Sequence, residues 1–407
     1  MKKLLLGSSM LAAVALATSA QADTPKITVG GVIDWQVGII SDDTDNTSSH
    51  AFRNDTEISF NVDGKAQNGL GYGAVIVLEA DVSSSVTTVN NVGGAANPGA
   101  FGGIAGAGTG LNASSDTDDE GFNASKTYIY LDGSWGRVEL GSNVGPSTTL
   151  EIDAASIARG TGGIDGDWYF FVNPTGAGAT HVITPDLPLA FGINTGGFGA
   201  ENQENLNRIT YYSPRLSGFQ LGVSYAANDR NRGQGIDLSD NNIGRADQIF
   251  TGALNYEGNY NGFGVGAAAN IEYGNAEAST TEDLLAWSVG GVLSYQGFSI
   301  AGSYADWDDS LSDAALAPTV GELDSADFFT LGAAYEHGPY GISVTYIDSS
   351  FDTVAGDNDF ENIVVSADYQ LAPGLTPYAE ISFFDAESDV VADNDGTVFL
   401  FGTQLNF

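Results

Sequence analysis

The chain has 407 residues, with 52 Asp and Glu against 13 Lys and Arg, 54 Gly and no Cys. The lack of Cys excludes disulfides, iron–sulfur clusters, thiolate zinc sites and Cys nucleophiles. A net charge of −39 would repel a phosphate backbone, so we expect no nucleic-acid partner. A hydrophobic content of 42% is too high for a solvated acidic tail, which indicates a folded protein.

Residues 1–22 have the features of a secretory signal peptide. Lys2 and Lys3 precede an apolar stretch, and residues 20–22 (Ala-Gln-Ala) form a small-x-small cleavage pattern. The apolar stretch is shorter than the roughly 20 residues of a spanning helix, which disfavours an N-terminal membrane anchor. We expect cleavage after Ala22, with residues 23–407 as the mature protein of a bacterial envelope.

The mature chain alternates apolar residues with small or polar ones from end to end. In the segment 263–273 the odd positions are apolar, and the segments 27–35, 219–225 and 340–346 show the same alternation. This period of two gives each β-strand one apolar and one polar face. Both a soluble β-sandwich and a membrane β-barrel would satisfy the pattern.

The connections between the predicted strands distinguish these two folds. Tight turns rich in Gly, Asn and Pro alternate strictly with longer loops. This alternation is typical of an outer-membrane barrel, whereas nothing in a soluble sandwich would sort short and long connections in this way. An even number of strands puts both termini on the side of the short turns. The sixteen predicted strands span residues 26–39, 54–65, 71–82, 123–132, 136–143, 206–213, 218–227, 247–257, 262–274, 284–296, 298–307, 326–337, 340–349, 360–371, 375–386 and 396–407.

The sequence therefore predicts an all-β fold, a 16-stranded antiparallel transmembrane β-barrel. An open sheet in lipid would leave unpaired amides at its edges, so the first and last strands must pair. The last strand ends on Phe407, with further aromatic residues at positions 399 and 401. Aromatic residues that share the lipid-facing parity, such as Trp35 and Tyr225, are expected to form interfacial girdles rather than a sugar-binding ladder in the pore.

Three segments and the C-terminal residue resemble the Gram-negative general porins, in particular the trimeric type of the alphaproteobacteria. The segments are residues 128–141 (YIYLDGSWGRVELG), 160–168 (GTGGIDGDW) and 207–225 (NRITYYSPRLSGFQLGVSY). The resemblance implies a trimeric 16-stranded barrel in the outer membrane, whose third loop folds inward and narrows the pore. It also implies that Phe407 acts as an assembly signal.

The connection over about residues 144–205 fits the position of that third loop. It is the longest connection in the chain, and a structureless loop of this length is usually functional. Residues 147–159 have a helix-like composition. Residues 181–200 are more apolar than a loop, so they form either an extra hairpin or a displaced part of the sixth strand.

A diffusion pore selects solutes by its width and by the charges that line it. We expect a cation-selective pore, because no Lys or Arg follows Arg245, whereas 26 Asp and Glu do. The alternative interpretation is that the acidic residues are an adaptation to a saline habitat or keep the outer loops soluble, without controlling which ions pass. The charged candidates at the constriction are Glu151, Asp153, Arg159, Asp165 and Asp167, and strand parity turns Arg208, Arg137, Glu139, Glu79, Asp34, Glu57, Glu272 and Glu380 into the lumen.

The expected function is passive diffusion of ions and small hydrophilic solutes through a water-filled channel. A substrate-specific channel and a plugged structural or adhesive barrel are the alternatives. We expect no enzyme, because the three His residues fall in a predicted outer loop, the third loop and a periplasmic turn, and no pairing of a His with a Ser nucleophile is indicated.

No resident cofactor is expected, although the outer loops offer candidate cation sites. Carboxylate oxygens are suitable ligands for Ca²⁺ or Mg²⁺, which would bridge the loops to lipopolysaccharide. The expected partners are therefore outer-membrane lipid and lipopolysaccharide, two further copies of the chain, small hydrophilic solutes and cations. The candidate acids are Asp42 with Asp43, residues 116–120, residues 306–309, Asp357 with Asp359, and Asp393 with Asp395.

Overall fold

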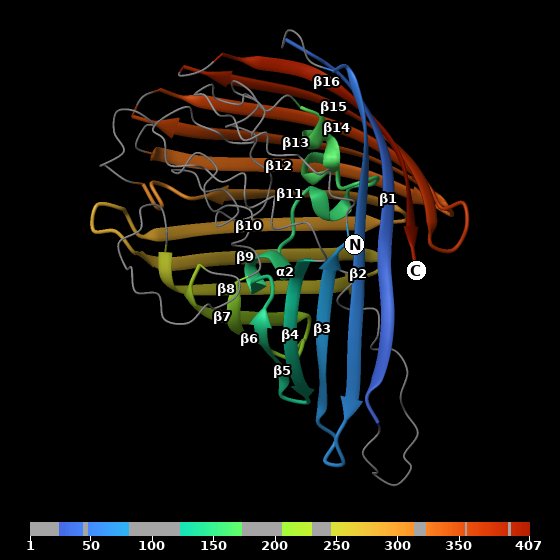
Figure 1. Ribbon diagram of the computed structural model, residues 1–407, viewed down its shortest axis with the longest axis vertical. Helices are drawn as coiled ribbons and strands as arrows, with labels where there is room; N and C mark the ends of the chain where they lie inside the picture. The colour runs from blue at the N-terminus through green and yellow to red at the C-terminus, as the bar shows by residue number, and fades with distance from the viewer. Residues whose placement is uncertain are drawn as a thin grey trace, which may run out of the picture.

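The computed structural model describes residues 24–43, 48–80, 123–172, 206–229, 246–312, 323–354, 356–389 and 392–407. Within these residues, sixteen antiparallel strands close into a barrel in which β1 pairs with β16 (Figure 1). The strands are β1 (Lys26–Asp42), β2 (His50–Lys65), β3 (Gly71–Glu79), β4 (Asn123–Gly133), β5 (Gly136–Ser142), β6 (Asn207–Tyr212), β7 (Phe219–Asn228), β8 (Ala246–Tyr260), β9 (Phe263–Ala276), β10 (Leu284–Tyr295), β11 (Phe298–Asp306), β12 (Leu323–His337), β13 (Tyr340–Thr353), β14 (Asn358–Tyr369), β15 (Leu375–Ser388) and β16 (Asn394–Asn406).

Each predicted strand has a counterpart in this barrel, so the predicted fold class is confirmed. The clearest difference in bounds is at β2, which begins at His50 because its ladder with β1 continues to the pair Ile39–His50. Arg53, which sequence analysis placed in a loop, therefore lies on a strand. The signal peptide and the segment 181–200 fall outside the described residues, so cleavage after Ala22 and an extra hairpin stay predictions.

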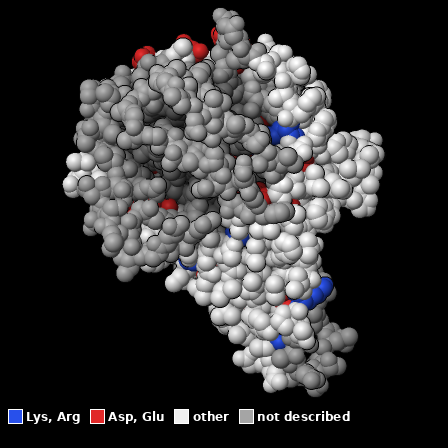
Figure 2. All heavy atoms as spheres, in the orientation of Figure 1, with Lys and Arg blue, Asp and Glu red and all other residues white. Residues whose placement is uncertain are grey.

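Strand β9 shows how the alternating pattern produces two different faces. Ile271 and Tyr273 are 50% and 41% exposed, whereas Asn270 and Glu272, on the other face, are 5% and 4% exposed. The apolar face points outward, toward lipid in a membrane barrel. In the view of Figure 2, the described outer surface over β1–β3 is largely uncharged. No helix among the described residues has the length and apolar character needed to cross a membrane.

The ends of the barrel wall close on each other through the last residue. The Phe407 backbone N–H donates to the Gly31 carbonyl, and the Gly31 N–H donates to the Phe407 carbonyl, both at 3.1 Å. The Phe407 side chain is 59% exposed. The terminal residue thus completes the ladder that removes the sheet edge, and its role as an assembly signal stays a prediction.

The described part of the third loop follows the inner wall of the barrel (Figure 1). Its short helix α2 (Pro146–Thr149) contacts β7, β8 and β9, and its 3-10 helix η1 (Ala155–Ile157) contacts β11 and β12. Two more 3-10 helices follow, of which η2 (Gly163–Asp165) contacts β13 and β14, and η3 (Asp167–Phe171) contacts β1 and β16. The helix-like composition of residues 147–159 therefore produces only a four-residue helix and one 3-10 turn.

Inward-facing glycines allow this loop to lie directly on the strands. A Cβ atom added at Gly290 of β10 would overlap the carbonyl oxygen of Ile152. A Cβ atom at Gly38 of β1 would overlap the ring of Phe171. At both positions the missing side chain leaves the space that the loop occupies. This close approach allows the loop to lie along the wall.

Candidate functional site

An apolar patch on the inner wall holds the distal end of the described loop. Trp168 of η3 is fully buried and stacks on Phe360 of β14 and Phe384 of β15, with ring centroids 5.9 and 6.2 Å away. The cluster around it includes Ile347 of β13 and Val398 of β16. Aromatic residues of this chain therefore line the barrel interior as well as its outer face.

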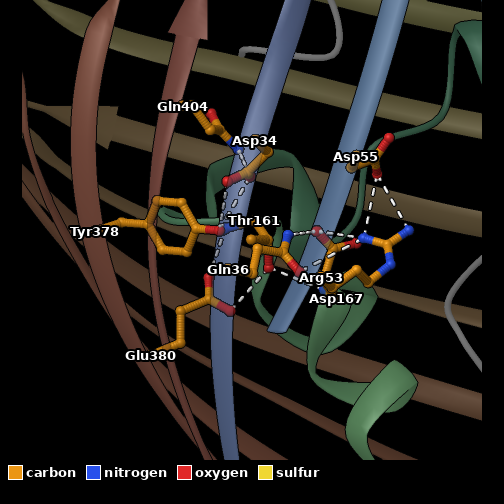
Figure 3. A network of polar contacts seen from close by, with 9 residues as sticks. All are labelled: Asp34, Gln36, Arg53, Asp55, Thr161, Asp167, Tyr378, Glu380 and Gln404. Carbon is orange, nitrogen blue, oxygen red and sulfur yellow. Dashed lines mark hydrogen bonds and ion pairs between the residues drawn. The ribbon is translucent and has the colours of Figure 1, made fainter. Parts of the chain in front are cut away.

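Asp167 connects the loop to strands β1 and β2 (Figure 3). Its carboxylate accepts a hydrogen bond from Gln36 Nε2 and lies 3.6 Å from Arg53 Nη1. Burial raises the pKa of Asp167 to about 6, although the Arg53 charge and the Gln36 hydrogen bond favour the ionised form. Both terminal nitrogens of Arg53 also lie 3.3 Å from Asp55 Oδ2. Arg53 therefore faces two carboxylates.

Thr161 connects the same region of the loop to strand β15. Its backbone N–H and its hydroxyl donate to the two carboxylate oxygens of Glu380, at 2.6 and 2.8 Å. The Thr161 hydroxyl oxygen also accepts the Asp167 backbone N–H at 2.9 Å. Glu380 thereby fixes the turn that carries Asp167.

Arg159 pairs with carboxylates on strands β12 and β14. It forms ion pairs with Glu336 and with Asp368, the latter at 2.7 Å. Its backbone N–H donates to Ser343 Oγ of β13 at 2.9 Å. The single basic residue predicted for the constriction loop is therefore also faced by two carboxylates.

The proximal end of the loop is held by polar contacts. Ser147 of α2 donates to Glu272 of β9 at 2.5 Å, and both residues are buried. Asp153 is buried as well, and its Oδ1 accepts the Ser156 backbone N–H at 2.8 Å. Asp153 therefore stabilises a turn of the loop, while Glu151 beside it is half-buried.

The other charged residues predicted on strands divide into separate groups. Arg137 donates to Glu139 at 2.6 Å, and its guanidinium carbon lies 3.8 Å from the centroid of the Tyr130 ring. Arg208 is 4% exposed, and its Nη1 lies 3.4 Å from Ser224 Oγ. These two arginines lie on the inner wall at β5 and β6, away from the Asp167 network.

Three further predicted acids lie on strands β1 to β3 of the wall. Asp34 is buried and accepts hydrogen bonds of 2.9 Å from Tyr378 and from Gln404 (Figure 3). Glu57 and Glu79 are half-buried partners in the β2–β3 ladder.

Asp165 lies half-buried in η2. The structure thus brings Asp34, Asp167 and Glu380 into one network and leaves the other predicted acids apart. The role of each of these residues in permeation stays a prediction.

The sequence pattern did not indicate that Arg53, Gln36 and the aromatic residues 168–171 belong to this site. Arg53 shares the inward parity of Glu57, so extending the second strand by a few residues would have found it. The aromatic run had no such signal, because its environment is formed by strands distant in sequence.

No three His, Asp or Glu side chains of the described residues gather as ligands for a metal ion. The acidic segment 116–120 falls outside those residues. Loop-bound Ca²⁺ or Mg²⁺ therefore stays a prediction.

Comparison with known proteins assigns the barrel to a family. A model of the Gram-negative porins matches residues 7–389. The chain belongs to the Gram-negative porin family. This membership confirms the outer-membrane location and the channel architecture that the resemblance implied.

Individual relatives of this porin are distant. An anion-selective porin from Comamonas acidovorans superposes with a TM-score of 0.61 at 15% identity, over 94% of this chain and 100% of that one. An uncharacterized protein of Rickettsia bellii is 27% identical over 351 residues, which cover 69% of this chain and 76% of the relative. The chitoporin of Vibrio furnissii is 25% identical over 294 residues, 66% of this porin and 67% of that one. The structural likeness at 15% identity shows the fold and does not transfer ion selectivity.

Proposed function

We propose that this porin is a general diffusion pore that prefers cations over anions. The observation that supports the preference is the charge balance along the third loop, where Arg53 and Arg159 each face two carboxylates. Each of these two groups is negative overall when its carboxylates are ionised. Negative charge close to the path of permeation raises the local concentration of cations and lowers that of anions.

The acidity of the rest of the chain supports the same preference. Every residue after Arg245 is neutral, acidic or His, so strands β8 to β16 contribute no Lys or Arg to the lumen. The anion-selective porin from Comamonas acidovorans shows that this fold also supports the opposite preference. Selectivity therefore depends on the particular side chains that line the loop and wall.

Passive diffusion makes a direct experimental prediction. Proteoliposomes that contain the refolded porin should swell in solutions of uncharged sugars, at rates that fall smoothly as the sugar grows, because a wide pore discriminates by size. The K⁺ current in a planar bilayer should rise with KCl concentration without saturating. A rate or current that saturates with one solute would identify a substrate-specific channel, for which the similarity to a chitoporin provides the present support. A barrel without swelling or current would be the plugged, structural alternative.

We further propose that the porin assembles as a homotrimer in contact with outer-membrane lipid and lipopolysaccharide. Family membership supports the trimer, and the exposed apolar residues of the outer face support the contact with lipid. Membership of a family of channels also supports the expectation that the protein is not an enzyme.

A further inference from the structure

Two of the four aromatic residues in η3 keep part of their surface exposed. A 3-10 helix has about three residues per turn, so Trp168 and Phe171 share one side, and both pack against the wall cluster. Tyr169 and Phe170 are 37% and 36% exposed, although η3 lies inside the barrel (Figure 1). Two rings left open on a segment that is anchored from behind form a rigid apolar surface, and such surfaces mark binding sites.

The charge around this pair is predominantly negative. Burial raises the pKa of Tyr169, and the carboxylates of Asp167, Asp165 and Asp55 raise it further, while only Arg53 lowers it. The geometry agrees, because Asp165 and Asp167 lie in the same short segment as Tyr169, and Asp55 pairs with the Arg53 side chain that covers Phe170. A positively charged solute is attracted to such a surface, and an anion is repelled.

One cationic side chain, Arg53, already contacts this pair of rings. The guanidinium carbon of Arg53 lies 3.6 Å from the centroid of Phe170, and the Phe170 and Tyr169 centroids are 4.0 Å apart. No Lys or Arg in the described part of the chain lies over the Tyr169 ring. Tyr169 is therefore the member of the pair that is open to a second cation.

We propose that Tyr169 and Phe170 form a weak binding site for organic cations of the alkylammonium class on the permeation path. An alkylammonium ion has methyl or methylene groups that pack on aromatic rings, and its charge interacts with their π faces and with the surrounding carboxylates. A neutral sugar would pack on the rings but would gain nothing from the carboxylates. An inorganic anion would neither pack on the rings nor be attracted by the carboxylates. Weak binding is compatible with passage, since a permeant solute must also leave its site. This inference rests on the proposed function, because the solute reaches the site only through an open channel.

The test is the K⁺ current through single channels of the full mature porin, with tetramethylammonium as the probe. Tetramethylammonium should reduce the current to a plateau, and Tyr169→Leu should raise the half-inhibiting concentration about two- to fivefold, the effect of losing one exposed cation–π contact. Tyr169→Phe keeps the ring and should retain the inhibition. Tyr340→Leu is the matched control, because it removes a 61% exposed tyrosine from the outer face and should leave the inhibition unchanged. If Tyr169→Leu fails to fold, Tyr169→Met removes the same ring and provides the same comparison.

Each other outcome contradicts a defined part of the argument. An equal half-inhibiting concentration in the wild type and in Tyr169→Leu would overturn the site. Saturable inhibition by glucose but not by tetramethylammonium would overturn its assignment to cations and indicate a sugar platform. A K⁺ current on which tetramethylammonium has no saturable effect would contradict this inference alone, whereas the absence of any current would contradict the proposed function together with it.

Discussion

Both ends of the described third loop make polar and apolar contacts with the barrel, but they differ in the side chain that dominates each attachment. At the proximal end, Ser147 donates to Glu272, on a stretch of wall that also carries buried Thr251. At the distal end, Trp168 stacks on both Phe360 and Phe384 and has no exposed surface. A hydrogen bond contributes about 0.5–1.5 kcal/mol net, whereas removing a buried aromatic side chain costs about 3–5 kcal/mol.

The interior of the barrel is therefore not uniformly polar. An apolar patch over β12–β16 holds the distal end of the loop, and the cluster there includes Phe328 and Val364. Because apolar packing positions the loop, its carboxylates need not all serve as anchors. Asp167 and Asp165 flank the rings of Tyr169 and Phe170 in this segment, and we propose that they act there on solutes.

The largest expected effect comes from Trp168→Ala, which removes the distal anchor. The loop should lose about 3–5 kcal/mol of attachment, because removing a large buried ring leaves a cavity over Phe360 and Phe384. Chymotrypsin should then cleave the folded barrel after residues 169–171 much faster than it cleaves the wild type. Trp35→Ala is the control, since Trp35 is 48% exposed on the outer face. Equal cleavage in the wild type and in Trp168→Ala would show that the apolar patch does not hold the loop.

A smaller effect is expected from Gly290→Ala, which tests the close approach between the two anchors. The new Cβ overlaps the Ile152 carbonyl, so the loop must move toward the pore axis, at a cost of about 1–3 kcal/mol. Single-channel conductance should fall. Gly291→Ala is a closely matched control, because its Cβ meets only the Gly266 carbonyl oxygen, at 3.4 Å. An unchanged conductance in Gly290→Ala, or an equal fall in both variants, would contradict this position of the loop.

The proximal anchor should respond less than the distal one. Ser147→Ala removes the hydrogen bond to Glu272 and leaves a buried carboxyl group with one partner fewer, at a cost of about 1–3 kcal/mol. Hydrogen exchange of the backbone amides in α2 should accelerate, while those in η3 should stay protected. Acceleration at both ends would show that the two anchors act as one unit.

The smallest expected effect is a change of selectivity with pH. Because burial raises the pKa of Asp167 to about 6, the ionised form dominates at pH 7.5 and the protonated form at pH 5. The group around Arg53 then loses one negative charge, so the preference for K⁺ over Cl⁻ should weaken as the pH falls. Asp167→Asn should lower the preference at pH 7.5 and flatten its change with pH between 7.5 and 5. If the preference for K⁺ over Cl⁻ changes with pH in Asp167→Asn as it does in the wild type, a group other than Asp167 is responsible for the change.

The strands could be predicted from sequence because their signals are local. Alternation over ten residues, Gly and Asn at turns, and the order of short and long connections fixed the barrel and placed the third loop. The path of that loop could not be predicted, because it depends on Phe360 and Phe384 at inward positions where the pattern favours polar residues. Arg53 was missed for a different reason, since the ladder between β1 and β2 extends beyond the alternating segment.

The reversal potential of the wild-type porin in a tenfold KCl gradient tests the central claim most directly. The K⁺ equilibrium potential in this gradient is about 59 mV in magnitude. If the paired carboxylates at Arg53 and Arg159 control permeation, the reversal potential at pH 7.5 should lie clearly on the K⁺ side of zero. A reversal potential at zero or on the Cl⁻ side, in a channel that conducts, would contradict the proposed control of ion passage by these groups.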